Sequence, residues 1–521
     1  CSLYNNTTGF SNVAVGYSTL YANTTGVYNT AIGQQSLAAN TTGQKNVGVG
    51  YHALRCNTTG KTNVGVGYKS ACKTTYGESN VAIGYESFRE NTIGCMNVAI
   101  GLNSLLLNTT GCWNTAIGSN VGYKNTTGVR NTYIGYQTGM CNETGTDNVA
   151  LGTQSLRFNT VSKNIGIGYQ AAYLNTTGLG NVAIGTCSLH QNTTGVCQIA
   201  IGEEALYSHT TGYQNIAIGF KAARENVCGN TSIFIGVCSG HSSGNGYGNI
   251  AMGIESYCSG TGSSNVAIGA QAFKCAGAGS FNVLLGHAVA CCANGNFTNN
   301  VVIGTNAAKC KVSGINNTVM GWCSLAGNAG SSSRNTAIGY ETQKCNTSGE
   351  KNTSLGVSTL CVNTIGNCNI AIGFESLKNN VSSHNNIGIG WSALFCHGAS
   401  AQSGASNIAI GCGAMYHSTT GYGNVAIGEQ SLYQNTCGVN NVALGAGSLR
   451  DNTTGSNNVA VGDGALKQNI TGKHNVAIGQ GTLCKNTIGV SNTVVGDRAL
   501  QCNTTGNNNT AIGYESLKAN T

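Results

Sequence analysis

The chain has 521 residues, with 77 Gly, 24 Cys, no Pro and only 8% charged residues, which leave a formal net charge of +8. So weak a charge, without a clustered basic stripe, argues against nucleic-acid binding, and an apolar share of 40% excludes a disordered chain. The sequence has no run of about 18 apolar residues, the length that spans a membrane. Pro is absent and Gly does not recur at every third residue, which excludes collagen.

A five-residue motif, most often Asn-Val-Ala-Ile-Gly, recurs 30 times, first at Asn12 and last at Asn509. Successive copies lie 17 residues apart, except for single-residue slips and one step of 21 from Asn386 to Asn407. A fixed period this short is typical of a solenoid. We therefore expect one all-β solenoid, a parallel β-roll of about 30 rungs, rather than the three or four domains that length alone suggests. Rungs about 4.8 Å apart would make a rod of roughly 140 Å.

The rung is numbered here from the motif Asn as position 1 to position 17, with the consensus N-V-A-I-G-Y-x-S-L-x-x-N-T-T-G-x-x. Positions 2 and 4 are β-branched or aliphatic, which predicts a short strand with both facing inward and position 3 facing outward. Position 5 is Gly in all 30 copies, which predicts a corner of positive φ or close backbone approach. Position 9, usually Leu, is expected to face inward from a second short strand, and Asn-Thr-Thr-Gly at positions 12 to 15 is a predicted turn.

Position 1 is Asn in 28 copies, with Gln198 and Ser232 as the exceptions. Stacked Asn side chains can form a hydrogen-bonded ladder along the axis. Alternatively, each Asn is a turn residue that caps the start of its strand. Both interpretations are structural, and the sequence leaves both open.

Position 3, predicted to point outward, is small and apolar in most rungs and charged in none, as in Ala14, Ala82 and Ala426. A solvated strand face would carry polar side chains, whereas a sheet buried on both faces loses that alternation. We therefore expect lateral association of chains, most simply a parallel homotrimer. A monomer with a row of Ala exposed to solvent is the alternative.

Residues 1–225 keep the Asn-Thr-Thr-Gly turn well. Residues 226–335 have Gly/Ser-rich turns between the same strands, and the regular turn returns over residues 336–521. We interpret 1–521 as a single continuous solenoid. One longer loop, from His397 to Ser406, is a candidate for a protruding contact or a tolerated insertion at a corner. Both ends fall within a rung without a polar capping rung, so we expect a window of a longer fibre or a unit that stacks end to end.

The run from Asn80 to Ser87, Asn-Val-Ala-Ile-Gly-Tyr-Glu-Ser, resembles the YadA-like head repeats of trimeric autotransporter adhesins. The longer form, Asn23-Thr-Thr-Gly26 followed by Asn29-Thr-Ala-Ile-Gly33, is similar to repeats in phage and viral tail-fibre-like proteins. The resemblance implies a parallel β-roll, trimerisation and a surface-exposed, fibrous or adhesive role. The 17-residue rung is longer than the usual adhesin head repeat, and 24 Cys are unusual for that family.

Many Cys recur at equivalent positions of neighbouring rungs, where stacking places them within disulfide range. We expect rung-to-rung disulfides formed in an oxidising compartment; unpaired buried thiols and metal binding are the alternatives, the latter disfavoured because the nine His are scattered. The candidate groups are Cys95 with Cys112, Cys56 with Cys72, Cys258 with Cys275, Cys345 with Cys361, Cys484 with Cys502, and Cys275 with Cys292 and Cys310.

The turn Asn-Thr-Thr is also an acceptor sequence for N-glycosylation, although the turn alone explains the same residues. We expect glycosylation because Cys are abundant. The candidate acceptors are Asn6, Asn23, Asn40, Asn57, Asn108, Asn125, Asn142, Asn175, Asn192, Asn380, Asn452, Asn469 and Asn503.

No convergent acids, nucleophile–base pair or phosphate loop stand out, so we expect neither an enzyme nor a cofactor or metal site. The leading hypothesis is an extracellular structural fibre or filament on a cell or virus surface, self-associating and adhesive toward a surface glycan or receptor, with no nucleic-acid partner and no membrane insertion. The alternative is an ice- or carbohydrate-binding solenoid that uses the paired turn threonines, such as Thr24 and Thr25, as two ladders.

Overall fold

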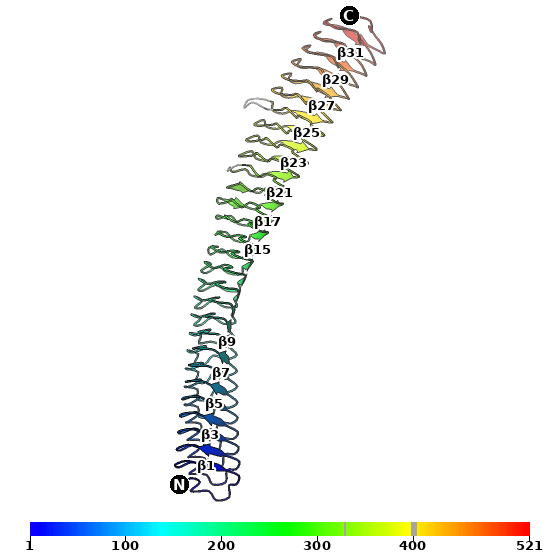
Figure 1. Cartoon of the computed structure of the whole chain (residues 1–521). Helices are drawn as coiled ribbons and strands as arrows, with labels where there is room; N and C mark the ends of the chain where they lie inside the picture. The colour runs from blue at the N-terminus through cyan, green and yellow to red at the C-terminus, as the bar shows by residue number, and fades with distance from the viewer. Residues whose placement is uncertain (328–329, 398–403) are drawn as a thin grey trace. The chain divides into compact units, whose positions relative to one another are not determined.

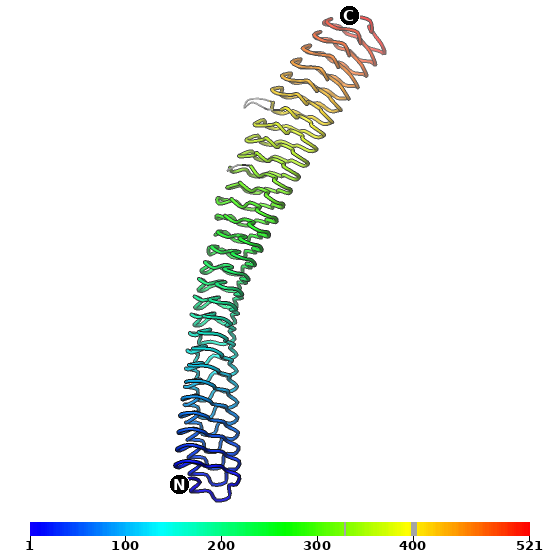
Figure 2. Tube along the Cα trace, viewed as in Figure 1, coloured from blue at the N-terminus to red at the C-terminus, as the bar shows by residue number. Residues whose placement is uncertain are grey.

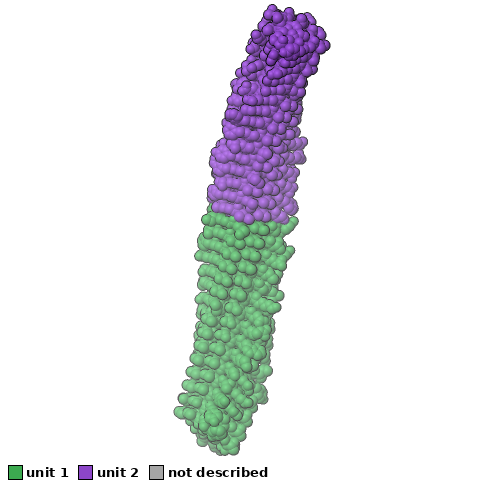
Figure 3. Space-filling view, turned by 90° about the vertical axis from the view of Figure 1, so that its right-hand side faces the viewer, with its two compact units in different colours: residues 1–255 green, residues 256–521 purple. Residues whose placement is uncertain are grey.

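A computed structural model describes residues 1–327, 330–397 and 404–521. It divides into two compact units, Cys1–Glu255 and Ser256–Thr521 (Figure 3), and the boundary falls inside the zone of Gly/Ser-rich turns. Each unit is a parallel β-solenoid in which one 17-residue repeat forms one rung (Figures 1 and 2). The regular elements of the described residues are all β-strands, without a helix. The predicted all-β solenoid is confirmed.

Unit 1 contains fifteen three-residue strands, each at positions 2 to 4 of its rung. Each strand pairs in parallel and in register with the next, as Val47 with Val64 and Val49 with Val66. The strands are β1 (Val13–Val15), β2 (Thr30–Ile32), β3 (Val47–Val49), β4 (Val64–Val66), β5 (Val81–Ile83), β6 (Val98–Ile100), β7 (Thr115–Ile117), β8 (Thr132–Ile134), β9 (Val149–Leu151), β10 (Ile165–Ile167), β11 (Val182–Ile184), β12 (Ile199–Ile201), β13 (Ile216–Ile218), β14 (Ile233–Ile235) and β15 (Ile250–Met252).

Unit 2 repeats this arrangement, and the described part adds one pair of two-residue strands, β18 with β20. The strands are β16 (Val266–Ile268), β17 (Val283–Leu285), β18 (Phe297–Thr298), β19 (Val301–Ile303), β20 (Gly314–Ile315), β21 (Thr318–Met320), β22 (Thr336–Ile338), β23 (Thr353–Leu355), β24 (Ile370–Ile372), β25 (Ile387–Ile389), β26 (Ile408–Ile410), β27 (Val425–Ile427), β28 (Val442–Leu444), β29 (Val459–Val461), β30 (Val476–Ile478), β31 (Thr493–Val495) and β32 (Thr510–Ile512).

The predicted orientation of the strand residues is wrong. Position 3 faces the interior, where Ala31 and Ala82 are fully buried, whereas the position-4 residue Ile83 is 37% exposed. The reason is the narrowness of the coil: a Cβ added at Gly65 would already lie 2.9 Å from Leu54 Cγ on the facing wall. A small residue therefore faces inward, and the larger β-branched residues of positions 2 and 4 face outward.

The predicted second strand is also wrong. Leu at position 9 is buried as expected, but the chain over positions 6 to 11 forms turns in which positions 7 and 9 have positive φ, as in Gln35 (55°) and Leu37 (50°). Left-handed conformations cost about 1–2 kcal/mol per non-Gly residue. Hydrogen bonds between rungs offset this cost, since Gln35 N donates to Tyr17 O at 2.8 Å and Leu37 N to Ala53 O at 3.0 Å.

The sequence predicts positive φ or close backbone approach at the position-5 Gly, and the structure has both. Gly50 has φ of +128°, and a Cβ added there would lie 2.5 Å from the carbonyl oxygen of Gly67, the equivalent Gly of the next rung. Because the distance allows no side chain, successive rungs can approach at this corner only through bare backbone.

The aromatic residues at position 3, Tyr133 and Phe234, are matched by Gly at position 9. Tyr133 fills the space that Leu occupies elsewhere, because a Cβ added at Gly139 would lie 2.6 Å from Tyr133 Cε1, and one at Gly122 3.1 Å from Tyr133 Cδ2. Phe234 is likewise fully buried against Gly240. In these two rungs, an aromatic ring from the strand thus fills the interior space that Leu from the facing turn fills elsewhere.

This matching predicts a reciprocal rescue. Phe234→Ala removes a buried ring and is expected to destabilise the surrounding rungs by about 3–5 kcal/mol, and Gly240→Leu alone clashes with Phe234. The double variant recreates the common Ala and Leu pair, and Leu tolerates positive φ at this position, as in Leu206 (φ 51°). Hydrogen exchange of β13 to β15 is expected to show rescue in the double variant. Additive destabilisation would contradict the matching.

Candidate functional site

The Asn at position 1 forms a buried ladder. Asn46 Nδ2 donates to Asn29 Oδ1 of the preceding rung at 3.2 Å, and Asn46 N donates to the same oxygen at 3.0 Å. Asn46 Nδ2 also reaches Gly60 O at 2.8 Å, which ties the strand start to the turn of its own rung. The ladder and the cap, which the sequence left as alternatives, are thus both present in one side chain.

The predicted glycosylation sites form a second ladder, at position 12. Asn40 Nδ2 donates to Asn23 Oδ1 at 2.8 Å and to Gly43 O at 3.1 Å. All the candidates except Asn6, which is partly exposed, have buried side chains. A glycan on a buried Nδ2 would replace these hydrogen bonds and find no space in the coil, so this fold and glycosylation at those twelve nitrogens exclude one another. Asn6 stays a predicted acceptor.

The hydroxyl group of the first turn threonine, at position 13, donates a hydrogen bond to the turn of the next rung. Thr24 Oγ1 donates to Thr41 O at 3.1 Å, and Thr41 Oγ1 donates to Thr58 O at 3.2 Å. Position 14 faces solvent, as at Thr25 and Thr42. The paired threonines are therefore not two equivalent rows of free hydroxyl donors.

Three ionisable residues replace Asn in the interior column at position 12: His209, Lys311 and His397. Lys311 Nζ donates to the carbonyl oxygen of Asn346, and burial lowers the pKa of Lys311 to about 8. Burial also lowers the pKa of His209, and that of His397 to about 4. The ring of His397 contacts Ser418 Oγ at 3.3 Å and Gly404 O. The loop predicted to protrude beyond His397 lies, over 398–403, outside the described residues.

Among the Cys candidates, Cys95 and Cys112 stack directly, with 3.0 Å between their sulfur atoms. Both are free thiols. Cys56 N donates to Cys72 O at 3.0 Å, and Cys345 N to Cys361 O at 2.9 Å, so these pairs also lie on neighbouring rungs. Cys275 N instead donates to Cys291 O at 2.9 Å. Disulfides at the remaining candidates, Cys258, Cys292, Cys310, Cys484 and Cys502, stay a prediction.

The acidic residues at position 7 are engaged in surface ion pairs. Glu86 lies 2.7 Å from Arg89, Glu375 2.6 Å from Lys378, and Glu515 2.5 Å from Lys518. In the described residues, no three His, Cys, Asp or Glu side chains converge to hold a metal ion. The described part also has no helix long and apolar enough to cross a membrane.

The outward strand face carries apolar side chains on successive rungs of each unit. Positions 2 and 4 are aliphatic, Met or Thr in every rung, and Ile83, Ile117 and Ile218 are 36–37% exposed. At position 6, beside the strands, Tyr51 stacks on Tyr68 at 5.3 Å, and Tyr68 on Tyr85 at 4.9 Å. This surface, positions 2 and 4 of β1 to β15 in unit 1 and of their counterparts in unit 2, is called here the aliphatic face.

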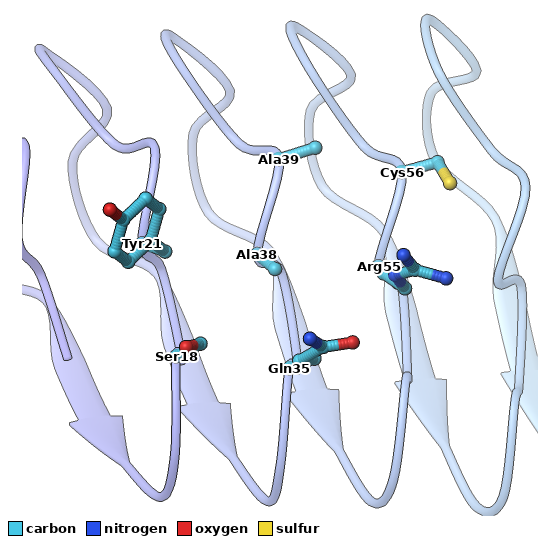
Figure 4. A pocket seen from close by; sticks show the side chains of 7 residues that line it. All are labelled: Ser18, Tyr21, Gln35, Ala38, Ala39, Arg55 and Cys56. Atoms are coloured by element: carbon cyan, nitrogen blue, oxygen red, sulfur yellow. The ribbon is translucent and has the colours of Figure 1, made fainter. Parts of the chain in front are cut away.

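The side chains after the corner form further rows along the coil. In Figure 4, Ser18 and Gln35 lie in the row of position 7, and Tyr21, Ala38 and Arg55 in the row of position 10. The small side chain of Ala38 leaves a hollow of about 370 Å³ between these rows.

A scan against models of protein families and a search of curated proteins found no match to this chain.

The buried histidines predict acid sensitivity. An unfolded His has a pKa near 6.5, and the folded-state pKa of His397 is lower, about 4. The contribution of the neutral His397 ring to the free energy of unfolding is therefore fully present above about pH 6.5. It is lost as the pH falls toward 4, by about 3 kcal/mol. Hydrogen exchange of peptides from 387–397 and 408–418, corrected for intrinsic rates, measures this loss.

His397→Asn restores the common residue and is expected to reduce the acid-dependent loss of protection. The control, His417→Asn, changes a partly exposed ring and is expected to leave the loss unchanged. Equal pH dependence in the two variants would show that the buried ring of His397 is not the cause.

The stacked thiols predict an oxidation test. Mild oxidation of the folded chain is expected to join Cys95 and Cys112, with loss of two hydrogen atoms in the linked peptide, as measured by mass spectrometry. The hydrogen bond with Cys112 is the main cause that raises the pKa of Cys95 to about 11, so the reaction accelerates with rising pH. Cys437, which has no Cys at the equivalent position of a neighbouring rung, is the control. A Cys95 peptide that links no more readily than Cys437 would contradict the pairing.

Proposed function

We propose that this protein is a structural fibre or filament protein that associates laterally with copies of itself through the aliphatic face. The observation that carries the proposal is the partial to full exposure of the aliphatic residues at positions 2 and 4 on successive rungs of each unit. Large exposed apolar surfaces mark interaction sites in soluble proteins. Burial of this face against another chain removes apolar area from water, and each Å² buried contributes about 25 cal/mol of favourable free energy.

The basis for self-association differs from the one that the sequence suggested. The row of Ala is interior and fills the coil, so it cannot contact a second chain. The aliphatic face takes its place, since it has no charged residue at positions 2 or 4 in any rung and charge is depleted at the core of protein interfaces. A parallel homotrimer is the stoichiometry that the resemblance to adhesin head repeats implies.

The proposed setting is extracellular, on a cell or virion surface, with an adhesive role toward a surface glycan or receptor. The abundance of Cys supports an oxidising compartment. End-to-end stacking is proposed as a second mode of assembly, because strands at either end of a solenoid have unpaired backbone groups. We propose no catalytic activity, because the position-7 carboxylates are paired with neighbouring cations at the surface.

The threonine-ladder alternative has less support. The position-13 hydroxyls donate to carbonyl oxygens in the turn of the next rung, and Tyr76 and Ile93 interrupt the exposed column at position 14. A flat, repeated row of paired hydroxyls is what ice binding requires, so the fibre function is favoured.

Light scattering coupled to size-exclusion chromatography tests the proposal. The wild-type chain, of 53.1 kDa, is expected to elute as an oligomer, with a trimer as the preferred state. Ile83→Lys with Ile117→Lys places two charges on the aliphatic face and is expected to yield monomer without a change in circular dichroism. The control pair Thr25→Lys and Thr42→Lys, on the exposed turn, is expected to remain oligomeric. A monomeric wild-type chain would overturn lateral association.

A further inference from the structure

A groove lined by aromatic rings runs across four rungs of unit 2, beside strands β24 to β27. Its volume is about 370 Å³, within the range of about 300–1,000 Å³ that is typical of small-molecule sites. Four rings and several polar groups line it, among them Phe374, Trp391, Tyr416, Tyr433, Glu375 and Gln430. We call it the aromatic groove.

Two rows of side chains form its walls. On the wall from position 6, Phe374 is 47% and Trp391 61% exposed, so their rings are available to a ligand. On the wall from position 10, Tyr416 stacks between Phe395 at 4.9 Å and Tyr433 at 5.3 Å, with interplanar angles of 6° and 18°. Stacking holds the second wall in place, so a ligand would meet a largely preformed surface.

Gly413 opens the floor of the groove. It occupies position 7, where the neighbouring rungs carry Ser392 and Gln430. A Cβ added at Gly413 would lie 3.3 Å from Tyr433 Cε2, so a side chain there would enter the groove. The backbone does not require Gly, because Ser392 (φ 52°) and Gln430 (φ 53°) adopt nearly the same conformation as Gly413 (φ 63°). The missing side chain therefore creates space rather than relieving strain.

The charges around the groove favour a neutral ligand. Glu375 Oε1 accepts a hydrogen bond from Lys378 Nζ at 2.6 Å, and that ammonium lies 5.7 Å from the Phe395 ring. A cationic ligand, which aromatic cages otherwise bind well, would meet a carboxylate already paired and an ammonium nearby. No Lys or Arg lines the groove among its described residues, and the nearby ammonium of Lys378 is already paired with Glu375, so an anion would find no unpaired cation in the lining.

We propose that the aromatic groove binds a neutral carbohydrate. The C–H faces of a sugar ring pack against the electron-rich faces of Trp391 and Phe374, and its hydroxyl groups hydrogen-bond with Gln430 and the free lone pairs of Glu375. The hollow in Figure 4 has the same volume but only one aromatic ring, Tyr21, and a cation, Arg55. The combination of rings, neutrality and open floor is thus a property of this part of unit 2 and not of the repeat in general.

This inference deepens the adhesive part of the proposed function, and it does not require lateral association. The groove lies in unit 2, whereas the substitutions that test self-association, at Ile83 and Ile117, lie in unit 1. Binding is therefore measured on both the wild-type chain and the Ile83→Lys/Ile117→Lys chain, so that failure of one proposal can be told from failure of the other.

The experiment uses a panel of neutral oligosaccharides built from glucose, galactose, mannose and N-acetylglucosamine, with choline as a cationic probe. At least one oligosaccharide is expected to bind and to change the tryptophan fluorescence, with the affinity confirmed by calorimetry. Trp391→Ala and Gly413→Gln are expected to weaken binding by tenfold or more. Their matched controls, Trp322→Ala at position 6 and Gly481→Gln at position 7, keep the groove intact and are expected to bind as the wild type does.

Three results would overturn the proposal. The first is no binding of any neutral oligosaccharide of the panel, and the second is binding that the groove variants and their controls reduce equally. The third is a preference for choline that depends on Trp391, which would assign the groove to organic cations instead. Circular dichroism of each variant distinguishes lost binding from lost folding.

Discussion

The width of the coil is the constraint on which the rest of the structure depends. The space between the strand and the facing turn commonly holds one Ala opposite one Leu, as at the fully buried Ala31 and Leu37, and at Gly65 even a methyl group would crowd Leu54. With so thin an apolar core, each rung buries little hydrophobic area, and stability must come from contacts between rungs as in other solenoids. Backbone hydrogen bonds, corner Gly contacts and the two Asn ladders all act along the axis, each joining a rung to its neighbours.

The polar interior follows from this geometry. Asn29 and Asn40 are fully buried, and a buried amide without partners costs about 1–3 kcal/mol. Each is satisfied by the equivalent Asn of a neighbouring rung and by a Gly carbonyl of its own turn. Regular spacing is thus both the cause and the result of the ladders, because a rung out of phase would leave its amide groups unpaired. The three ionisable residues that replace Asn at position 12, His209, Lys311 and His397, each have a lowered pKa.

Much of the fold could be predicted from the repeat alone. The strands, the corner at Gly50 and the buried Leu37 follow from period, β-branching and invariant Gly. The orientation of the strand could not, because alternation fixes which residues share a face but not which face is interior. Large apolar residues such as Ile83 suggested the inside, and only the coil width reverses that choice. The turn conformation of Leu37 has no sequence signal either, since Leu rarely adopts positive φ. Of the candidate sites, the stacking of Cys95 on Cys112 follows from phase, whereas the aromatic groove depends on residues of four rungs and on the missing side chain of Gly413.

The matching of large and small interior residues has a consequence for how such a chain changes in length. Tyr133 meets Gly122 in the preceding rung and Gly139 in its own, so its space is shared by two repeats. Gene duplication or deletion of a single period preserves the coil where all interior residues have the common sizes. Around Tyr133, the same event would separate a large residue from the gap that accommodates it. The interior therefore divides the chain into interchangeable single repeats and larger blocks that can be inherited only together.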